Sequence, residues 1–311
     1  MFKMNSKIKK FGSLKRKKIQ LLLLMLIFFA FVFAFSYVPL FGWIMAFQNF
    51  RPGIPFLSQE FIGLRNFELI FMMWNDFSMV LKNTLALSGL TLLVTPIPLL
   101  FAILLAHLPS KRLSKITQVI AALPNYISFV LLYAVFFAVL APSDGLLNVI
   151  LRVFLGPEVA TNFLADSDLA WIMQTIVHLF KTMGFSAIIY IAAMTGIDPS
   201  LYEAAEVDGA GKIAKIIHIT LPGVSSTFFV LFLLGIANML SGAGFEQYFV
   251  FQNPMTLGRL EVIDTFIYKM GILQNNFGFA TAAGMMKSLV SIVLLLIANN
   301  LSKAVRGERI F

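Results

Sequence analysis

The chain has 311 residues, of which 59% are apolar and only 13% are charged. Soluble domains are usually about 45–50% apolar, so this composition excludes a soluble globular protein and indicates several membrane crossings. The net charge of +9 does not indicate nucleic-acid binding, because the basic residues cluster in short segments beside apolar runs. The chain has no cysteine and only three scattered histidines, which excludes disulfides and thiolate metal sites and gives no sign of zinc.

The chain begins with a basic tail that precedes an apolar run. Eight Lys and Arg residues lie within residues 1–18. This pattern also occurs in cleaved signal peptides. Here, however, the run is about as long as the ~20 residues that span a bilayer, and further runs follow, so we expect an uncleaved helix. The six predicted spans are residues 19–39, 79–106, 117–140, 170–193, 224–250 and 281–301.

The distribution of Lys and Arg predicts how these spans are oriented. Sixteen of them lie in the tail, in the loops 107–116 and 194–223, and at the C-terminus, against five in the other segments outside the spans. Positive residues collect on the cytosolic side, so we expect both termini in the cytosol. The external segments are then 50–78, 253–279 and an amphipathic interfacial helix at 145–156.

The loop 197–222 is a polar segment between two apolar runs, and its pattern predicts two short helices joined by a tight turn. We call this helix–turn–helix unit the elbow. Asp198 and Pro199 are typical of the N-cap and first helical position. Gly209 stands where the first helix must stop and turn. A second short helix is expected over 212–219, and Pro222 is expected to end the loop and open the next span. We expect Leu201, Ala204, Ala205 and Ala210 to be buried, with Glu203 and Glu206 facing water.

This loop resembles the Glu-Ala-Ala loop of ATP-binding-cassette (ABC) importer permeases. In that family the loop is the coupling helix that docks into the ATP-hydrolysing subunit. The residues that the resemblance assigns to coupling are Glu203, Ala204, Ala205, Asp208, Gly209, Leu221 and Pro222. An ordinary amphipathic connector that happens to contain Glu-Ala-Ala is the alternative.

Four further stretches resemble the branch of the family that imports complex oligosaccharides, and together they cover essentially the whole chain. The stretches are 123–128, 181–190, 244–247 and 262–265. Asn125-Tyr126 departs from the more usual His-Phe, and Phe180 stands where Trp is common, which leaves the identity of the sugar open. The implied fold is all-α, with six transmembrane helices of the type I (MetI-like) importer permease. The implied division is a tail 1–18, a first helix with an external segment 19–78, a five-helix core 79–300 and a cytosolic tail 301–311.

The resemblance also implies a multi-pass location in a bacterial plasma membrane, and it implies partners. They are a second homologous permease, two ATP-binding subunits at the coupling loop, an extracellular sugar-binding lipoprotein and membrane lipid, without nucleic acid. The chain itself is expected to bind no cofactor, since Gly209 to Ile213 resembles only a fragment of a phosphate loop. ATP and Mg²⁺ would be used by the partner subunits.

Polar residues inside spans are costly and mark candidate sites. We therefore predict a substrate pathway that includes Asn125, Tyr126, Gln174, His178, Lys181, Asn238 and Glu246. Four of them, Tyr126, Gln174, His178 and Asn238, are expected to face one cavity at the junction with the partner permease. Hydrogen bonds that pack the helices are the rival explanation, and a Lys181–Glu246 ion pair is the rival for Lys181. Lys287 is expected to contact a partner subunit or extend outward to the interface.

Two other functions remain to be weighed. One is an importer of another solute, such as a sugar phosphate or an amino acid. The other is an intramembrane serine protease, because Gly184-Phe185-Ser186-Ala187 resembles a nucleophile site. A serine nucleophile needs a histidine base on another membrane helix, and His178 lies two turns away on the same predicted span. We therefore predict no enzymatic activity.

Overall fold

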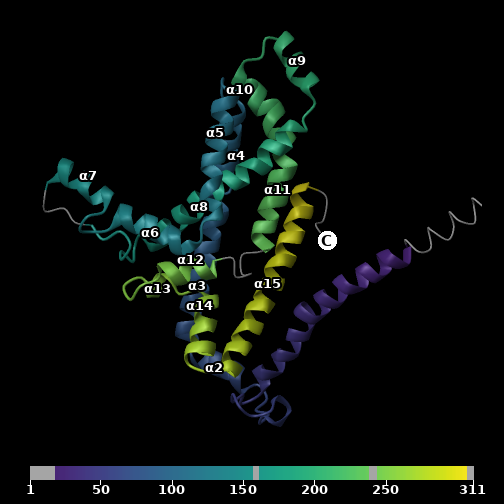
Figure 1. Cartoon of the computed structure of the whole chain (residues 1–311), viewed down its shortest axis with the longest axis vertical. Helices are drawn as coiled ribbons and strands as arrows, with labels where there is room; N and C mark the ends of the chain where they lie inside the picture. Colours follow the sequence, from purple (N-terminus) through teal and green to yellow (C-terminus); the bar gives the residue numbers. More distant parts are fainter. Residues whose placement is uncertain (1–17, 157–160, 238–243, 307–311) are drawn as a thin grey trace, which may run out of the picture. The chain divides into compact units, whose positions relative to one another are not determined.

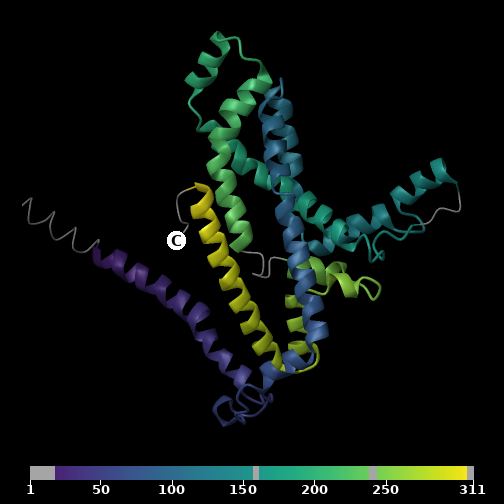
Figure 2. The same cartoon turned by 180° about the vertical axis from the view of Figure 1, so that it is seen from behind.

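The computed structural model describes residues 18–156, 161–237 and 244–306. Within these residues the secondary structure is helical, and the one β pairing is an isolated bridge between Gln48 and Phe61. The chain forms two compact units, residues 1–69 with 270–285 and residues 70–269 with 286–311, which are described separately (Figures 1 and 2). The helical class expected from composition is thus confirmed.

The first unit contains the N-terminal apolar helix, Lys18–Phe47, and the segment that follows it. The helix ends in 3₁₀ geometry over Val38–Phe47. Buried Asn66 then folds the segment back, because its Nδ2 donates to the carbonyls of Ala46 at 2.9 Å and Gln48 at 3.2 Å. Gly278, near the start of α15 (Phe277–Arg306), permits close approach here, since a Cβ would lie 2.7 Å from Asn66 Nδ2. The segment that follows the N-terminal helix is therefore a folded structure.

The second unit is built around α8 (Ala170–Thr195), which contacts α3 (Trp74–Leu93), α4 (Pro96–Ala106), α5 (Lys111–Ala122) and α11 (Leu221–Ala237). Small residues let the helices approach closely, as is usual in membranes. At Gly184 a Cβ would lie 2.1 Å from the carbonyl oxygen of Ala121 on α5. Ala102, Ala187 and Val224 are fully buried where α4, α8 and α11 meet.

The third span is not the single helix expected over 117–140. α5 and the 3₁₀ turn η4 (Leu123–Tyr126) form one helix, which is bent by 110° from α6 (Phe129–Leu140). Ile127 and Ser128 between them are extended. Ser128 then caps α6 by accepting from Leu131 N at 3.4 Å. Pro124 contributes because it lacks an N–H, but the two extended residues make the break.

The predicted amphipathic helix forms as α7 (Leu146–Leu155), with its polar face turned toward its own chain. Asn148 is fully buried and donates to the carbonyls of Ala141 and Thr161, each at 2.9 Å. Val153 and Phe154 are exposed on the other face. An exposed apolar face is what an interfacial helix presents to lipid.

The fifth span begins earlier than predicted. An unbroken helix runs over Lys212–Ile236, through α10 (Lys212–Lys215), the π-turn η5 (Ile216–Thr220) and α11. Pro222 thus lies inside a helix and does not open one; the wider π-turn before it accommodates the missing N–H. After α11 come α12 (Phe245–Phe251), α13 (Leu257–Leu260) and α14 (Ile263–Tyr268).

Candidate coupling element and polar pathway

The first helix of the elbow, α9 (Pro199–Val207), starts as the sequence predicts. Asp198 Oδ1 accepts from the N–H of Ser200 at 2.9 Å, and Pro199 occupies the first turn. The backbone hydrogen bond from Ser200 holds the pKa of the Asp198 carboxyl below its ordinary value. A charged acceptor at a helix N-terminus also suits the helix dipole. Both predictions for this end of α9 are confirmed.

The elbow itself is a Schellman turn at Gly209. The N–H of Ala210 donates to the Ala205 carbonyl at 2.8 Å, and the N–H of Gly209 donates to the Glu206 carbonyl at 3.0 Å. This pair of bonds defines the motif and requires a left-handed residue after the cap. Gly209 supplies it with φ of 75°, and Asp208 is the C-cap residue. The prediction that Gly209 stops and turns α9 is confirmed.

Two side-chain contacts join α9 to the helix that enters the membrane span. Tyr202 Oη lies 2.9 Å from Oγ1 of Thr220, which is buried in the π-turn. Lys215 Nζ lies 2.9 Å from the carboxylate of Glu206. This hydrogen bond and the lysine charge lower the pKa of Glu206. The elbow is therefore tied to the same continuous helix that begins at Lys212, and both contacts depend on tertiary folding that the sequence pattern does not reveal.

The outer face of the elbow is open. Glu203 and Ala204 are exposed, as are Leu201 and Ile213, with fractional exposures of 52% and 72%. The expectation that Leu201, Ala204, Ala205 and Ala210 are buried is not met in this chain; Ala205 and Ala210 are half-buried. Figures 1 and 2 place α9 and α10 at one end of the second unit, with α14 toward the other. Apolar and acidic residues thus share an uncovered surface at this end.

The remaining two residues predicted for coupling, Leu221 and Pro222, lie at the start of α11. Leu221 packs against the cluster formed by α4, α8 and α11, whereas Pro222 is exposed. Leu221 therefore links the elbow to the packed interior of the unit.

At the break in the third span, Asn125 and Tyr126 lie in η4. Tyr126 is 74% exposed, whereas Asn125 is half-buried. Lys181 on α8 directs its ammonium at the break and donates to the carbonyls of Pro124, Asn125 and Ile127. Its ion pair with Glu246, the rival explanation, does not form among the described residues, where Glu246 is exposed.

Gln174 instead packs two helices together. It is 3% exposed, and both its carbonyl and its Oε1 accept from Gln247 Nε2 on α12, at 2.8 and 2.9 Å. This is the packing hydrogen bond named as the rival to a pathway role. Gln247 belongs to the Gly-Phe-Glu-Gln stretch, so that stretch has a structural role here. The sequence analysis selected the neighbouring Glu246, which is exposed. No sequence signal distinguished Glu246 from Gln247.

His178 lines a cavity of about 230 Å³ between α3, α4, α8 and α11. Thr91, Thr182, Ser186 and Tyr190 also line it, so this cavity within the helices is partly polar. Neither Tyr126 nor Gln174 does, and Asn238 lies outside the described residues. Of the three described residues that were predicted to share a cavity with Asn238, His178 lines this cavity and the other two do not.

The positions of His178 and Ser186 on α8 do not fit a serine protease. His178 and Ser186 are eight residues apart within the one helix α8, which corresponds to about 12 Å along a helix axis. That separation is far beyond the ~3 Å that a base needs to take a proton from a nucleophile.

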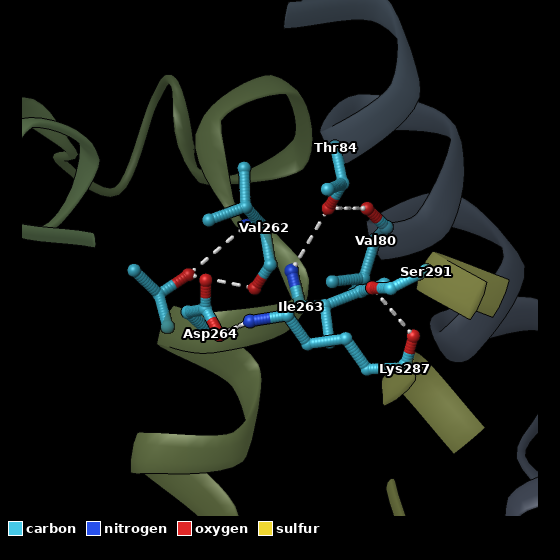
Figure 3. Close-up of polar contacts among 8 residues, drawn as sticks. Val80, Thr84, Val262, Ile263, Asp264, Lys287 and Ser291 are labelled. Atoms are coloured by element: carbon cyan, nitrogen blue, oxygen red, sulfur yellow. Dashed lines mark hydrogen bonds and ion pairs between the residues drawn. The ribbon is translucent and has the colours of Figure 1, made fainter. Parts of the chain in front are cut away.

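The expectation for Lys287 is wrong. Lys287 on α15 forms an ion pair with Asp264 on α14, and the two side chains are 15% and 24% exposed (Figure 3). In the same view Thr84 Oγ1 on α3 donates to the Val80 carbonyl at 2.8 Å and accepts from Ile263 N at 3.0 Å. Burial of a charge favours a partner within the chain over snorkelling. The Ile-Asp-Thr stretch therefore anchors α14 to two membrane helices.

Asn83 is a further residue that the sequence analysis missed. It is 2% exposed, and its Nδ2 donates to the carbonyls of Gly258 and Glu261 at 3.0 and 3.1 Å. A lone Asn inside a predicted span is the signal that could have drawn attention to it.

This architecture defines a class: an all-helical membrane protein whose second unit ends in a capped elbow. The profile of the family described as "Binding-protein-dependent transport system inner membrane component" matches residues 98–307. The chain therefore belongs to this family of ABC transporter permeases, as the resemblance of the Glu-Ala-Ala loop predicted.

Similar proteins agree on this family. The polygalacturonan/rhamnogalacturonan transport system permease protein YteP of Bacillus subtilis is 35% identical over 89% of this chain and 85% of its own length. A bacterial ABC transporter that imports the acidic polysaccharide alginate contains a chain of TM-score 0.84 and 32% identity, with coverages of 94% and 97%. A chain of the alginate transporter in complex with an alginate pentasaccharide-bound periplasmic protein has a TM-score of 0.83 and 33% identity. The match covers 94% of this chain and 98% of that one. The type I importer permease fold is thus confirmed.

Proposed function

We propose that this chain is the transmembrane permease subunit of an ABC importer that moves oligosaccharides into the cell. The observation that carries the proposal is the α9–Gly209–α10 elbow, with an exposed outer face and a continuous helix into the membrane. Such an element can convert a movement at its outer face into a tilt of α11. The cargo class is supported by the relatives, whose printed substrates are polygalacturonan, rhamnogalacturonan and alginate.

The mechanism is alternating access without covalent chemistry in this chain. Partner subunits bind and hydrolyse ATP with Mg²⁺, and their closure moves the elbow. A second, homologous permease completes the pore, and a sugar-binding protein delivers cargo from outside. A periplasmic protein of this kind occurs in the alginate complex. The ATPases must contact the elbow differently in two states, or the equilibrium would not shift.

A charge reversal at the elbow tests this function. Glu203→Lys should leave the protein in the membrane while sugar uptake and cargo-stimulated ATP hydrolysis fall at least about tenfold, the effect of losing a charged partner across an interface. Asp144→Lys makes the same reversal on an exposed residue of the predicted external side and should have little effect. Normal uptake by Glu203→Lys would contradict the assignment of the elbow.

Labelling of single cysteines tests the orientation. The chain has no cysteine of its own, so each introduced thiol is read without background. Cysteines at Lys115 and Gly211 should react only from the cytosol, and those at Ser58 and Asp168 only from outside. All four positions are exposed. Labelling of Gly211 from outside would exclude contact with a cytosolic ATPase.

The importer of another solute differs from this proposal only in its cargo. Uptake assays with oligosaccharides, sugar phosphates and amino acids, using the complete transporter with its binding protein, separate the two. Uptake of a sugar phosphate or an amino acid, without competition from oligosaccharides, would replace the cargo and retain the permease.

A further inference from the structure

At the break between η4 and α6 the Pro124 carbonyl accepts from Ile127 N at 3.3 Å, whereas the carbonyls of Asn125 and Ile127 have no backbone donor among the described residues. The last carbonyls of a helix have no donor of their own, and inside a membrane water does not supply one. Ile127 and Ser128 are extended, so the helix cannot continue past Tyr126. Carbonyls at a helix C-terminus also carry the negative end of the helix dipole. The break is therefore a place where a cation is stabilised.

Lys181 supplies that cation from a different helix. Its Nζ donates to the carbonyl of Pro124 at 3.4 Å, to that of Asn125 at 3.3 Å and, most closely, to that of Ile127. An ammonium has three donors, so these contacts account for its full capacity. The same Nζ lies 4.7 Å from the centre of the Phe129 ring, in the first turn of α6.

No carboxylate lies within 4.0 Å of Lys181 in the part of the chain that the structure describes. A charge in a span is expensive unless it is paired, and here carbonyl dipoles and an aromatic face take the place of an acid. Gly184, one turn further along α8, brings the α8 backbone against Ala121. Glycine and lysine together thus fix the position of α8 against the end of α5.

We propose that Lys181 is a positioning residue, a tethered cation that holds the break in the third span and thereby orients Asn125 and exposed Tyr126. It acts through these two residues and does not itself contact the sugar. The consequence for transport rests on the proposed function, but the geometry of the break does not, and the two can be measured separately.

The geometry is tested by spin-label distances in the full chain assembled with its transporter partners. Cysteines at Val119 on α5 and Val135 on α6 lie on exposed sites on either side of the break, and the chain has no other thiol. In this background the distance distribution should be narrow. Lys181→Met should broaden or shift it, and Lys181→Arg should restore most of the original distribution, because a guanidinium also donates to several carbonyls.

Lys82→Met is the matched control, because Lys82 is an exposed lysine on α3. It should leave the distances unchanged. If Lys181→Met gives the same narrow distribution as Lys82→Met, the inference is overturned. If Lys181→Met does not reach the membrane, Lys181→Gln replaces it. An amide keeps two donors without charge, so the Lys181→Gln distances should be spread more widely than those of the wild type but less widely than those of a chain without any donor at this position. A Lys181→Gln distribution identical to that of the wild type would also overturn the role of the cation.

Transport separates positioning from cargo contact. Lys181→Met should lower uptake at least about tenfold, on the scale of lost charge-assisted hydrogen bonds, and adding Lys181→Met to Tyr126→Ala should cost little more than Tyr126→Ala alone. Additive losses would show that Lys181 acts independently of Tyr126 and would contradict the inference. Altered distances with normal uptake would support the positioning role but contradict its link to the proposed function.

Discussion

Tyr202 Oη lies 2.9 Å from Thr220 Oγ1 and connects the exposed helix α9 to the buried residue of the π-turn at the base of the fifth span. The two residues are 18 positions apart in the sequence. A push on α9 is therefore transmitted both through the Gly209 elbow and through this direct contact. We therefore expect the elbow and the span to move together.

Removal of this hydrogen bond should weaken coupling. Tyr202→Phe deletes only the hydroxyl, and an intramolecular hydrogen bond contributes about 1 kcal/mol, or roughly fivefold in an equilibrium. We expect cargo-stimulated ATP hydrolysis to fall by about that factor while basal hydrolysis is unchanged. Thr220→Val should have the same effect, and the double variant should be no worse than either single one. Additive losses would show that the two side chains act separately.

Gly209 should tolerate few replacements. Its φ of 75° is costly for a β-branched residue, although no atom lies within 4 Å of the site of a Cβ. Gly209→Val should therefore distort the turn through backbone strain of about 1–2 kcal/mol and reduce coupled transport, and Gly209→Asn should be milder. Gly211 also has open space around it, but its φ is −70°. Gly211→Val is the control, and an equal loss there would rule out strain at Gly209 as the cause.

Removing one partner of the ion pair between Lys287 and Asp264 should destabilise the protein more than removing both. Lys287→Met leaves Asp264 without its partner. We expect the free energy of unfolding to fall by about 3 kcal/mol, which is near the lower end of the range for breaking a buried ion pair. The double variant with Asp264→Leu removes both charges and should recover much of the stability. Thermal unfolding of the purified protein in detergent measures this. Ser291→Ala, which removes only a hydrogen bond to the Lys287 carbonyl, is the control; a double variant less stable than either single one would contradict the pairing.

The contact between Glu206 and Lys215 should depend on pH in one direction. The hydrogen bond from Lys215 lowers the pKa of Glu206, so its contribution is present above the ordinary carboxyl pKa and is lost as the pH falls through the lowered one. A spin label at exposed Val207 should be more mobile in Glu206→Gln than in the wild type at pH 7. The difference should shrink below about pH 4, where carboxyls protonate. A difference that grows on acidification would contradict this sign.

Several features followed from the sequence alone because they depend on short stretches of chain. Apolar runs indicated the helices that are long enough to span a membrane. Asp198, Pro199 and Gly209 specified where α9 starts and stops, since capping and positive φ are properties of a few adjacent residues. The Glu-Ala-Ala spacing indicated the family for the same reason.

Tertiary structure decided how the polar groups inside the membrane are partnered. Lys181 binds carbonyls 54 to 57 positions away, Gln174 pairs with Gln247, and Lys287 pairs with Asp264. A hydropathy pattern shows that each of these groups needs a partner, but not which helix supplies it. The choice depends on how helices pack, because a buried polar group bonds with whatever donor or acceptor the fold brings within about 3 Å. At the 110° bend, likewise, the donor to the carbonyls of Asn125 and Ile127 is Lys181 on α8, which no local rule could place.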